Sequence, residues 1–237
     1  MEDLPGHLEQ QHALDRRGGG VQPGDDHGRL KPSALAGPTV SSKRHHRMTA
    51  ILDGFIPEPD IRERFTTTVH APHGLVMDVA ATFDMQSLPL VRAIFWLRQT
   101  LMRAAATPPR RPQGLLAETR ALGWGLLAEQ PGQLVVCGAA CQPWRANTSF
   151  TPLSADEFPT YDEPNQVKIA WTLETEALGP ALTRFSQETR AVGTDAQAKR
   201  SFRHYWRWAR VGIIAIRLLL MPAVRRAAER RWGARQA

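Results

Sequence analysis

The chain has 237 residues, 42% of them apolar, which is enough for one large domain with a buried core. Its net charge of +7 is concentrated at one end, because residues 195–237 hold 11 basic and only 2 acidic side chains. A basic charge confined in this way argues against a nucleic-acid-binding domain, in which the basic residues spread over the binding surface.

Residues 1–47 are rich in Gly and Pro and show no hydrophobic period of 2 or 3.6, so we expect a disordered tail. Met48 directly precedes the first regular segment, and we expect it to be the natural start of a domain that covers residues 48–237. The first 30 residues contain no apolar run typical of a signal peptide. We expect a cytoplasmic protein, because its two cysteines, interpreted as free thiols, fit a reducing compartment.

The domain begins with a predicted strand over residues 62–70, which are rich in Thr and Phe. Pro72 suits the first turn of a helix through about residue 83. A second helix is predicted over residues 88–106, where apolar residues recur at helical spacing: Leu90, Ile94, Leu97 and Leu101.

Two hairpins follow, one formed by residues 124–129 and 134–142 and the other by residues 166–177 and 182–192. A capping-box pattern between them predicts a short helix that holds Phe158. Cys137 and Cys141 lie about 13 Å apart along one predicted strand, too far for a disulfide, so we expect two buried free thiols.

The longest predicted helix starts at Thr194, whose spacing to Gln197 gives a second capping box, and Gly212 and Pro222 are expected to segment it. Its apolar run, residues 211–221, contains Arg217 and is shorter than the roughly 20 residues needed to span a membrane. Consecutive hairpins make the sheet antiparallel, and with the helices on one face of it the fold class is α+β.

Three stretches of the sequence resemble the SRPBCC or START-like superfamily, also called the helix-grip or polyketide cyclase-like fold. They are the strand and Ala-Pro helix start of residues 65–79, the strand entry of residues 163–173, and the last strand and helix of residues 188–206. The final stretch resembles an uncharacterised bacterial group of that superfamily.

The resemblance implies a curved antiparallel sheet around the long C-terminal helix, with an apolar cavity between them. Members bind lipids, sterols, polyketides or quinones, and some are cyclases. We therefore predict a protein that binds or carries a hydrophobic small molecule, with no cofactor and no metal. The candidate ligand-binding residues are Trp124, Trp171, Phe185, Phe202, Tyr205, Trp206 and Glu188.

No known nucleotide-binding or nucleophile motif is present, so no catalytic residue is identified. Glu188 and Arg190 share one face of their strand, and this face either lines the cavity or points outward. A cyclase or dehydratase is the alternative, with Glu188 acting beside His70 or Tyr205. His70, His73 and His204 match no known ligand spacing, and we interpret them as surface residues.

A third hypothesis concerns the basic, apolar C-terminal segment of residues 211–235. Such a segment can rest on an anionic membrane surface, with its arginines near the lipid headgroups. The alternative is a solvated helix face. Peripheral membrane contact through this segment is therefore a secondary hypothesis.

Overall fold

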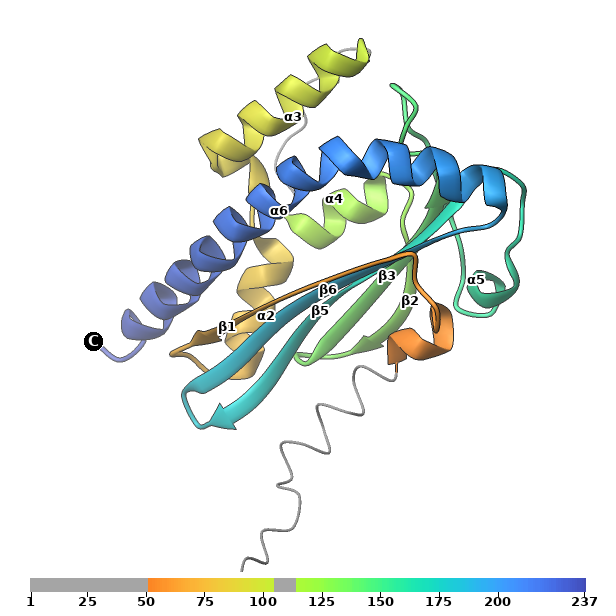
Figure 1. The fold of residues 1–237 in the computed structure, drawn as a ribbon. Coiled ribbons are helices and arrows are strands. Elements are labelled where there is room, and N and C mark those ends of the chain that lie inside the picture. The colour runs from red at the N-terminus through yellow and green to blue at the C-terminus, as the bar shows by residue number, and fades with distance from the viewer. Residues whose placement is uncertain (1–50, 105–113) are drawn as a thin grey trace, which may run out of the picture. The chain divides into compact units, whose positions relative to one another are not determined.

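The computed structural model describes residues 51–104 and 114–237 (Figure 1). The predicted tail, and the end of the helix predicted over residues 88–106, lie outside the described residues. The five predicted strands begin and end within two residues of the predicted bounds. The short strand over residues 150–152 and the helix over residues 115–121 were not predicted.

The elements follow one another in this order after a helical turn at residues 51–55: β1 (Ile61–Val69), α2 (His73–Thr82), the 3₁₀ helix η1 (Met85–Ser87), α3 (Pro89–Met102), α4 (Leu115–Ala121), β2 (Gly125–Gln130), β3 (Leu134–Cys141), β4 (Phe150–Pro152), α5 (Glu157–Thr160), β5 (Val167–Gly179), β6 (Leu182–Gly193) and α6 (Ala196–Gly233).

All six strands form one antiparallel sheet in the order β1-β6-β5-β3-β2, and β4 also pairs with β3. The register places Trp171 beside Cys137 on one side and Thr189 on the other, whereas Glu188 lies beside Thr172 and Arg64. Because side chains alternate along a strand, these two sets occupy opposite faces of the sheet.

Helix α6 lies along one face of the curved sheet, which we call the helix side (Figure 1). Leu220 and Val224 of α6 pack there with Trp171 and Phe185. This confirms the predicted α+β helix-grip arrangement of an antiparallel sheet and a long C-terminal helix. One detail differs, because Phe158 of α5 and the turn at residues 51–55 pack on the opposite face.

Helix α6 is continuous over 38 residues, so the prediction that Gly212 and Pro222 segment it is wrong. Pro222 leaves the carbonyl oxygen of Leu218 without its helical N–H partner. Both residues lie on the exposed side of α6, where water can satisfy that oxygen.

The cap of α6 also differs from the prediction. Asp195, not Thr194, is the N-cap residue, and its carboxylate accepts a 2.6 Å hydrogen bond from the Ala198 N–H. The Thr194 hydroxyl is engaged elsewhere, by the backbone of Gln166. The same backbone segment supplies a second bond to the cap, from the Asn165 N–H to Asp195.

Both cysteines lie on β3 and are buried and free, as predicted. Desolvation raises the pKa of the Cys137 thiol to about 11 and that of the Cys141 thiol to about 12. Both thiols are therefore protonated at neutral pH, and they serve as small apolar groups in the core.

Candidate functional site

The helix side of the sheet carries two separate apolar clusters. The first lies under the C-terminal half of α6 and contains two of the predicted residues, Trp171 and Phe185, both buried. Trp124 packs against it, with its ring centre 6.2 Å from that of Trp171. Three of the candidate aromatic residues thus come together at one end of the helix side.

The second cluster lies under the N-terminal half of α6. Phe202 and Tyr205 are buried there against Val167 and Ala191 of the sheet, and Trp206 packs at its edge. The rings of Phe202 and Trp206 are 5.8 Å apart. The structure therefore divides the six candidate aromatic residues into two groups of three rather than one wall.

Between the two clusters, α6 is not fully buried against the sheet. Ala209 and Leu220 are buried, but every residue from 211 to 219 is at least partly exposed. Eleven residues of helix, roughly 16 Å, separate these two anchors. On the sheet opposite, the helix-side residues Glu63, Phe65 and Thr189 are also only half-buried.

Arg217 lies in this middle segment of α6 and on its inner face, three residues before Leu220 and seven before Val224. It has no hydrogen bond or ion pair with any described residue. Desolvation by the surrounding protein lowers the pKa of its guanidinium to about 10, and no acidic group counteracts this effect. Arg217 is thus a partly exposed and partly desolvated charge without an acidic partner among the described residues.

Gln187 carries a buried unsatisfied polar atom on the helix side, and only 1% of the residue is exposed. Its Nε2 donates a 3.0 Å hydrogen bond to the Thr189 hydroxyl, but its buried Oε1 has no partner. On β6 it lies between Phe185 of the first cluster and Ala191 of the second, just as Arg217 lies between them on α6.

Neither Gln187 nor Arg217 was among the predicted site residues. The sequence does contain a signal for Arg217, which is the one charge in the apolar run of residues 211–221. It contains none for Gln187, because a single Gln in a polar strand has no distinctive spacing.

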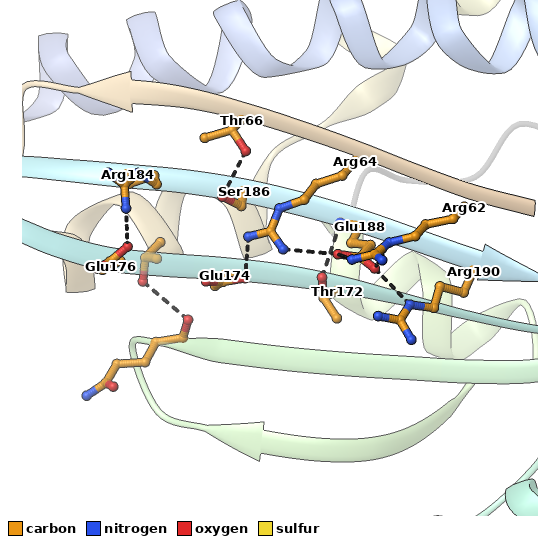
Figure 2. A network of polar contacts seen from close by, with 12 residues as sticks. Arg62, Arg64, Thr66, Thr172, Glu174, Glu176, Arg184, Ser186, Glu188 and Arg190 are labelled. Carbon is orange, nitrogen blue, oxygen red and sulfur yellow. Dashed lines mark hydrogen bonds and ion pairs between the residues drawn. The ribbon is translucent and has the colours of Figure 1, made fainter. Parts of the chain in front are cut away.

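The opposite face of the sheet, which we call the charged side, carries an ion-pair network centred on Glu188 (Figure 2). The Glu188 carboxylate accepts hydrogen bonds from Arg190 at 2.8 Å, Arg62 at 2.9 Å and Arg64 at 3.0 Å. Glu188 is 2% exposed and Arg190 1%. Three guanidinium groups therefore compensate for the burial of this carboxylate.

Arg190 links the network to the segment that covers this face. Its Nη1 donates hydrogen bonds to the Asp53 carboxylate at 2.6 Å and to the Ile56 carbonyl oxygen at 2.9 Å. Desolvation alone would lower the pKa of Arg190, but the hydrogen bonds to Glu188 and Asp53 outweigh it and raise the pKa. The arginine is therefore charged and fixed in place.

Two further pairs extend the charged side along β5. Arg64 lies 3.4 Å from Glu174, and Arg184 lies 2.6 Å from Glu176 (Figure 2). All of these side chains project from the same face, since they alternate with Leu173 and Phe185 on the helix side. The charged side is thus a ladder of cross-strand ion pairs.

The structure separates Glu188 from the six aromatic residues with which the sequence analysis grouped it. Glu188 lies on the charged side, whereas Trp171 and Phe185 lie on the helix side. It is not brought together with His70, whose ring instead meets Glu229 at 3.2 Å, or with Tyr205, which packs under α6. The arrangement needed for a Glu188-dependent cyclase is not present.

The histidines of the described residues lie apart from one another. His73 contacts the Gly132 carbonyl and His204 is exposed on α6. Within residues 51–104 and 114–237, no three His, Cys, Asp or Glu side chains are placed to hold a metal ion. A polar hollow of about 90 Å³ at the end of the sheet is smaller than typical ligand pockets of roughly 300–1,000 Å³.

No family model matches the chain, and no curated protein matches it. Among solved structures it is similar to an aromatase/cyclase from a Streptomyces species, at 14% identity over 72% of this chain and 94% of that one, with a TM-score of 0.26. A protein from Deinococcus radiodurans gives 14% identity, 64% and 99% coverage and the same TM-score of 0.26. An uncharacterised protein from Rhizobium leguminosarum is 16% identical over 68% of this chain and 99% of that one, with a TM-score of 0.22. Likeness at this level carries no functional argument.

Proposed function

We propose that this protein binds an amphipathic small molecule between α6 and the helix side of the sheet. The ligand has an apolar body and one acidic group, such as a carboxylate or a phosphate. The observation that carries the proposal is the buried Gln187 Oε1, which has no hydrogen-bond partner, together with the Arg217 guanidinium, which has no acidic partner among the described residues. Both groups lie between two apolar clusters.

A buried polar atom without a hydrogen bond destabilises a protein by about 1–3 kcal/mol, and an unpaired charge by more. Such groups persist in binding sites because a ligand supplies the missing partner. An acidic head beside Arg217 would accept its guanidinium hydrogen bonds, and a neighbouring ligand atom would satisfy the Gln187 amide. The amide is able to present either its oxygen or its nitrogen, since the Thr189 hydroxyl both donates and accepts.

The apolar body of the ligand would lie along the partly exposed middle of α6. Trp124, Trp171 and Phe185 would contact it at one end, and Phe202 and Trp206 at the other. Aromatic walls with a few polar groups are typical of small-molecule sites. Membership of the START-like superfamily is part of the same proposal, which describes a binder or carrier and assigns no reaction.

The test compares an anionic and a neutral apolar probe on the full chain. Anilinonaphthalene sulfonate carries an acidic group on an apolar body, and Nile red carries no charge. We expect Arg217→Met to weaken binding of the sulfonate about tenfold or more, because one charge-assisted hydrogen bond is lost. Nile red binding should change by less than about twofold, since the Met side chain fills similar apolar space.

Arg207→Met is the matched control, because Arg207 is exposed on the outer side of the same helix. It should leave both probes unaffected. Equal loss of both probes in Arg217→Met would contradict the proposed role of the charge. Failure of the unmodified protein to bind either probe would contradict the proposed function as a whole.

A further inference from the structure

A second feature of the molecule is independent of the interior site. Of the ten large apolar residues that are exposed in the described part of the chain, seven lie on two helices. On α3 they are Leu90, Trp96, Leu97 and Leu101, and on α6 they are Trp208, Val211 and Leu218. We call these seven residues the outer apolar surface.

The sequence pattern of α3 makes this exposure unusual. Leu90, Leu97 and Leu101 fall on one line along the helix, which is the pattern of a helix that buries that stripe. Only Val91 of α3 is buried, and the Leu stripe is 49–66% exposed. Ile94, the fourth residue of the predicted stripe, is partly buried, whereas the three leucines remain exposed within the described fold.

The two helices lie side by side. A Cβ at Gly212 of α6 would lie 3.1 Å from the Ile94 side chain of α3, and Met102 at the end of α3 packs on the cluster that contains Tyr205. Both helices lie on the same side of the sheet, and α3 lies farther from the sheet than α6 (Figure 1). The exposed apolar residues of the two helices therefore belong to one region of the surface.

The charge of this region has one sign. Helix α3 contains Arg92 and Arg98 and no acidic residue. Helix α6 contains seven arginines and one lysine before its first acidic residue, Glu229. Arg200 and Arg207 are exposed on the same side of α6 as Val211 and Leu218. Exposed apolar and Trp side chains flanked by arginines are complementary to anionic lipid headgroups above an acyl layer.

We propose that the outer apolar surface of α3 and α6 docks on an anionic lipid bilayer. None of the described helices is long and apolar enough to cross a membrane. The contact is therefore peripheral, with the Leu stripe and the two Trp side chains in the interfacial layer and the arginines at the headgroups. This places the membrane contact on α3 and the first two thirds of α6, rather than on residues 211–235 alone.

The experiment is sedimentation of the full chain with phosphatidylcholine vesicles, with and without phosphatidylglycerol. We expect binding to the anionic vesicles and little to the neutral ones. The variant Leu97→Gln/Leu101→Gln should weaken binding at least about tenfold, because two large side chains leave the acyl layer. The variant Arg207→Gln/Arg210→Gln should weaken it by a similar factor, at roughly fivefold for each basic residue near the surface.

Leu178→Gln is the matched control, because Leu178 is exposed at the end of β5 and belongs to neither helix. It should bind vesicles as the unmodified protein does. Circular dichroism checks that every variant is folded. Unchanged vesicle binding in the Leu97→Gln/Leu101→Gln variant overturns the proposal.

A self-association surface is the main rival explanation of the outer apolar surface. In that case analytical ultracentrifugation would show a dimer that Leu97→Gln/Leu101→Gln converts to a monomer, with no preference for anionic vesicles. That result also overturns the proposal. A monomer that sediments only with anionic vesicles supports it.

Discussion

Arg190 and Glu188 lie two residues apart on β6, and the Arg190 Nε is 2.8 Å from the Glu188 Oε1 in a nearly solvent-free environment. A strand places such residues on one face, where Arg62 and Arg64 of β1 reach the same carboxylate. Removal of Glu188 would leave the buried guanidinium of Arg190, and the more exposed Arg62 and Arg64, without their shared partner. This relationship makes Glu188 a determinant of stability.

We therefore expect Glu188→Ala to lower the free energy of unfolding by about 3–5 kcal/mol. Urea denaturation measures the loss. Glu58→Ala, at an exposed loop position, should change stability by less than about 0.5 kcal/mol. Under native conditions the folded Glu188→Ala protein should bind Nile red as the unmodified protein does. Weaker probe binding without a loss of stability would mean that Glu188 acts on the ligand.

Replacement of Arg217 should have the opposite effect on stability from replacement of Glu188. Arg217 is partly exposed, partly desolvated and without an acidic partner among the described residues, so its replacement by an apolar side chain of similar length removes a desolvation cost. We expect Arg217→Met to raise the stability of the ligand-free protein by about 0.5–2 kcal/mol. Thermal denaturation with and without the sulfonate probe measures both effects. A destabilised Arg217→Met protein would show that the guanidinium has a structural partner.

The burial of the two cysteines predicts their reactivity and the pH dependence of the stability of the fold. Burial raises the pKa of Cys137 to about 11 and of Cys141 to about 12, from an ordinary value of 9.0. Neither thiol should react with Ellman's reagent at pH 8 in the native protein, and both should react in denaturant. Fast reaction of one thiol in the native protein would contradict the described burial.

The raised pKa values of the two thiols also determine how the stability of the fold changes with pH. Below pH 9 both thiols are protonated in the folded and unfolded states, so their contribution to stability is fully present. As the pH rises from 9 through 11 and 12, the unfolded state loses protons first, and this contribution falls. Denaturation at pH 8 and pH 10 measures the decrease, and Cys137→Ala/Cys141→Ala should reduce it.

Gly125 at the start of β2 tests the packing of the sheet edge. A Cβ at this position would lie 2.1 Å from the carbonyl oxygen of Leu153, so the backbone must move. We expect Gly125→Ala to destabilise the fold by about 1–3 kcal/mol. Gly54→Ala is the control, because no atom lies within 4 Å of its added Cβ. Equal stability of the two variants would contradict the close approach of Leu153.

The sequence predicts the strands and the longest helices well because their periods and turns are local. The hairpin of β5 and β6 follows from the alternation of Val167, Ile169 and Trp171 and from the turn at Gly179. The sequence also predicts the buried thiols of β3. It fails at Pro222, where the exposure of the Leu218 carbonyl decides the outcome, and exposure depends on the tertiary structure.

The site was less predictable than the fold. Six aromatic residues were selected by residue type, but contacts across the sheet divide them into two clusters. The face occupied by Glu188 could not be decided, because the other residues of its strand are polar on both faces: Thr183, Arg184, Ser186, Gln187 and Thr189. Only the register with Arg64 and Thr172 fixes it. The unsatisfied amide of Gln187 is likewise a property of three-dimensional packing.

Native mass spectrometry of the purified full chain tests the central claim most directly. The account predicts a bound small molecule of a few hundred daltons, either co-purified or taken up from a lipid extract, that is released on denaturation and reduced in Arg217→Met. Its acidic group would be visible in negative-ion spectra of the released compound. A bare protein mass that stays unchanged after incubation with the lipid extract would contradict an interior amphiphile site.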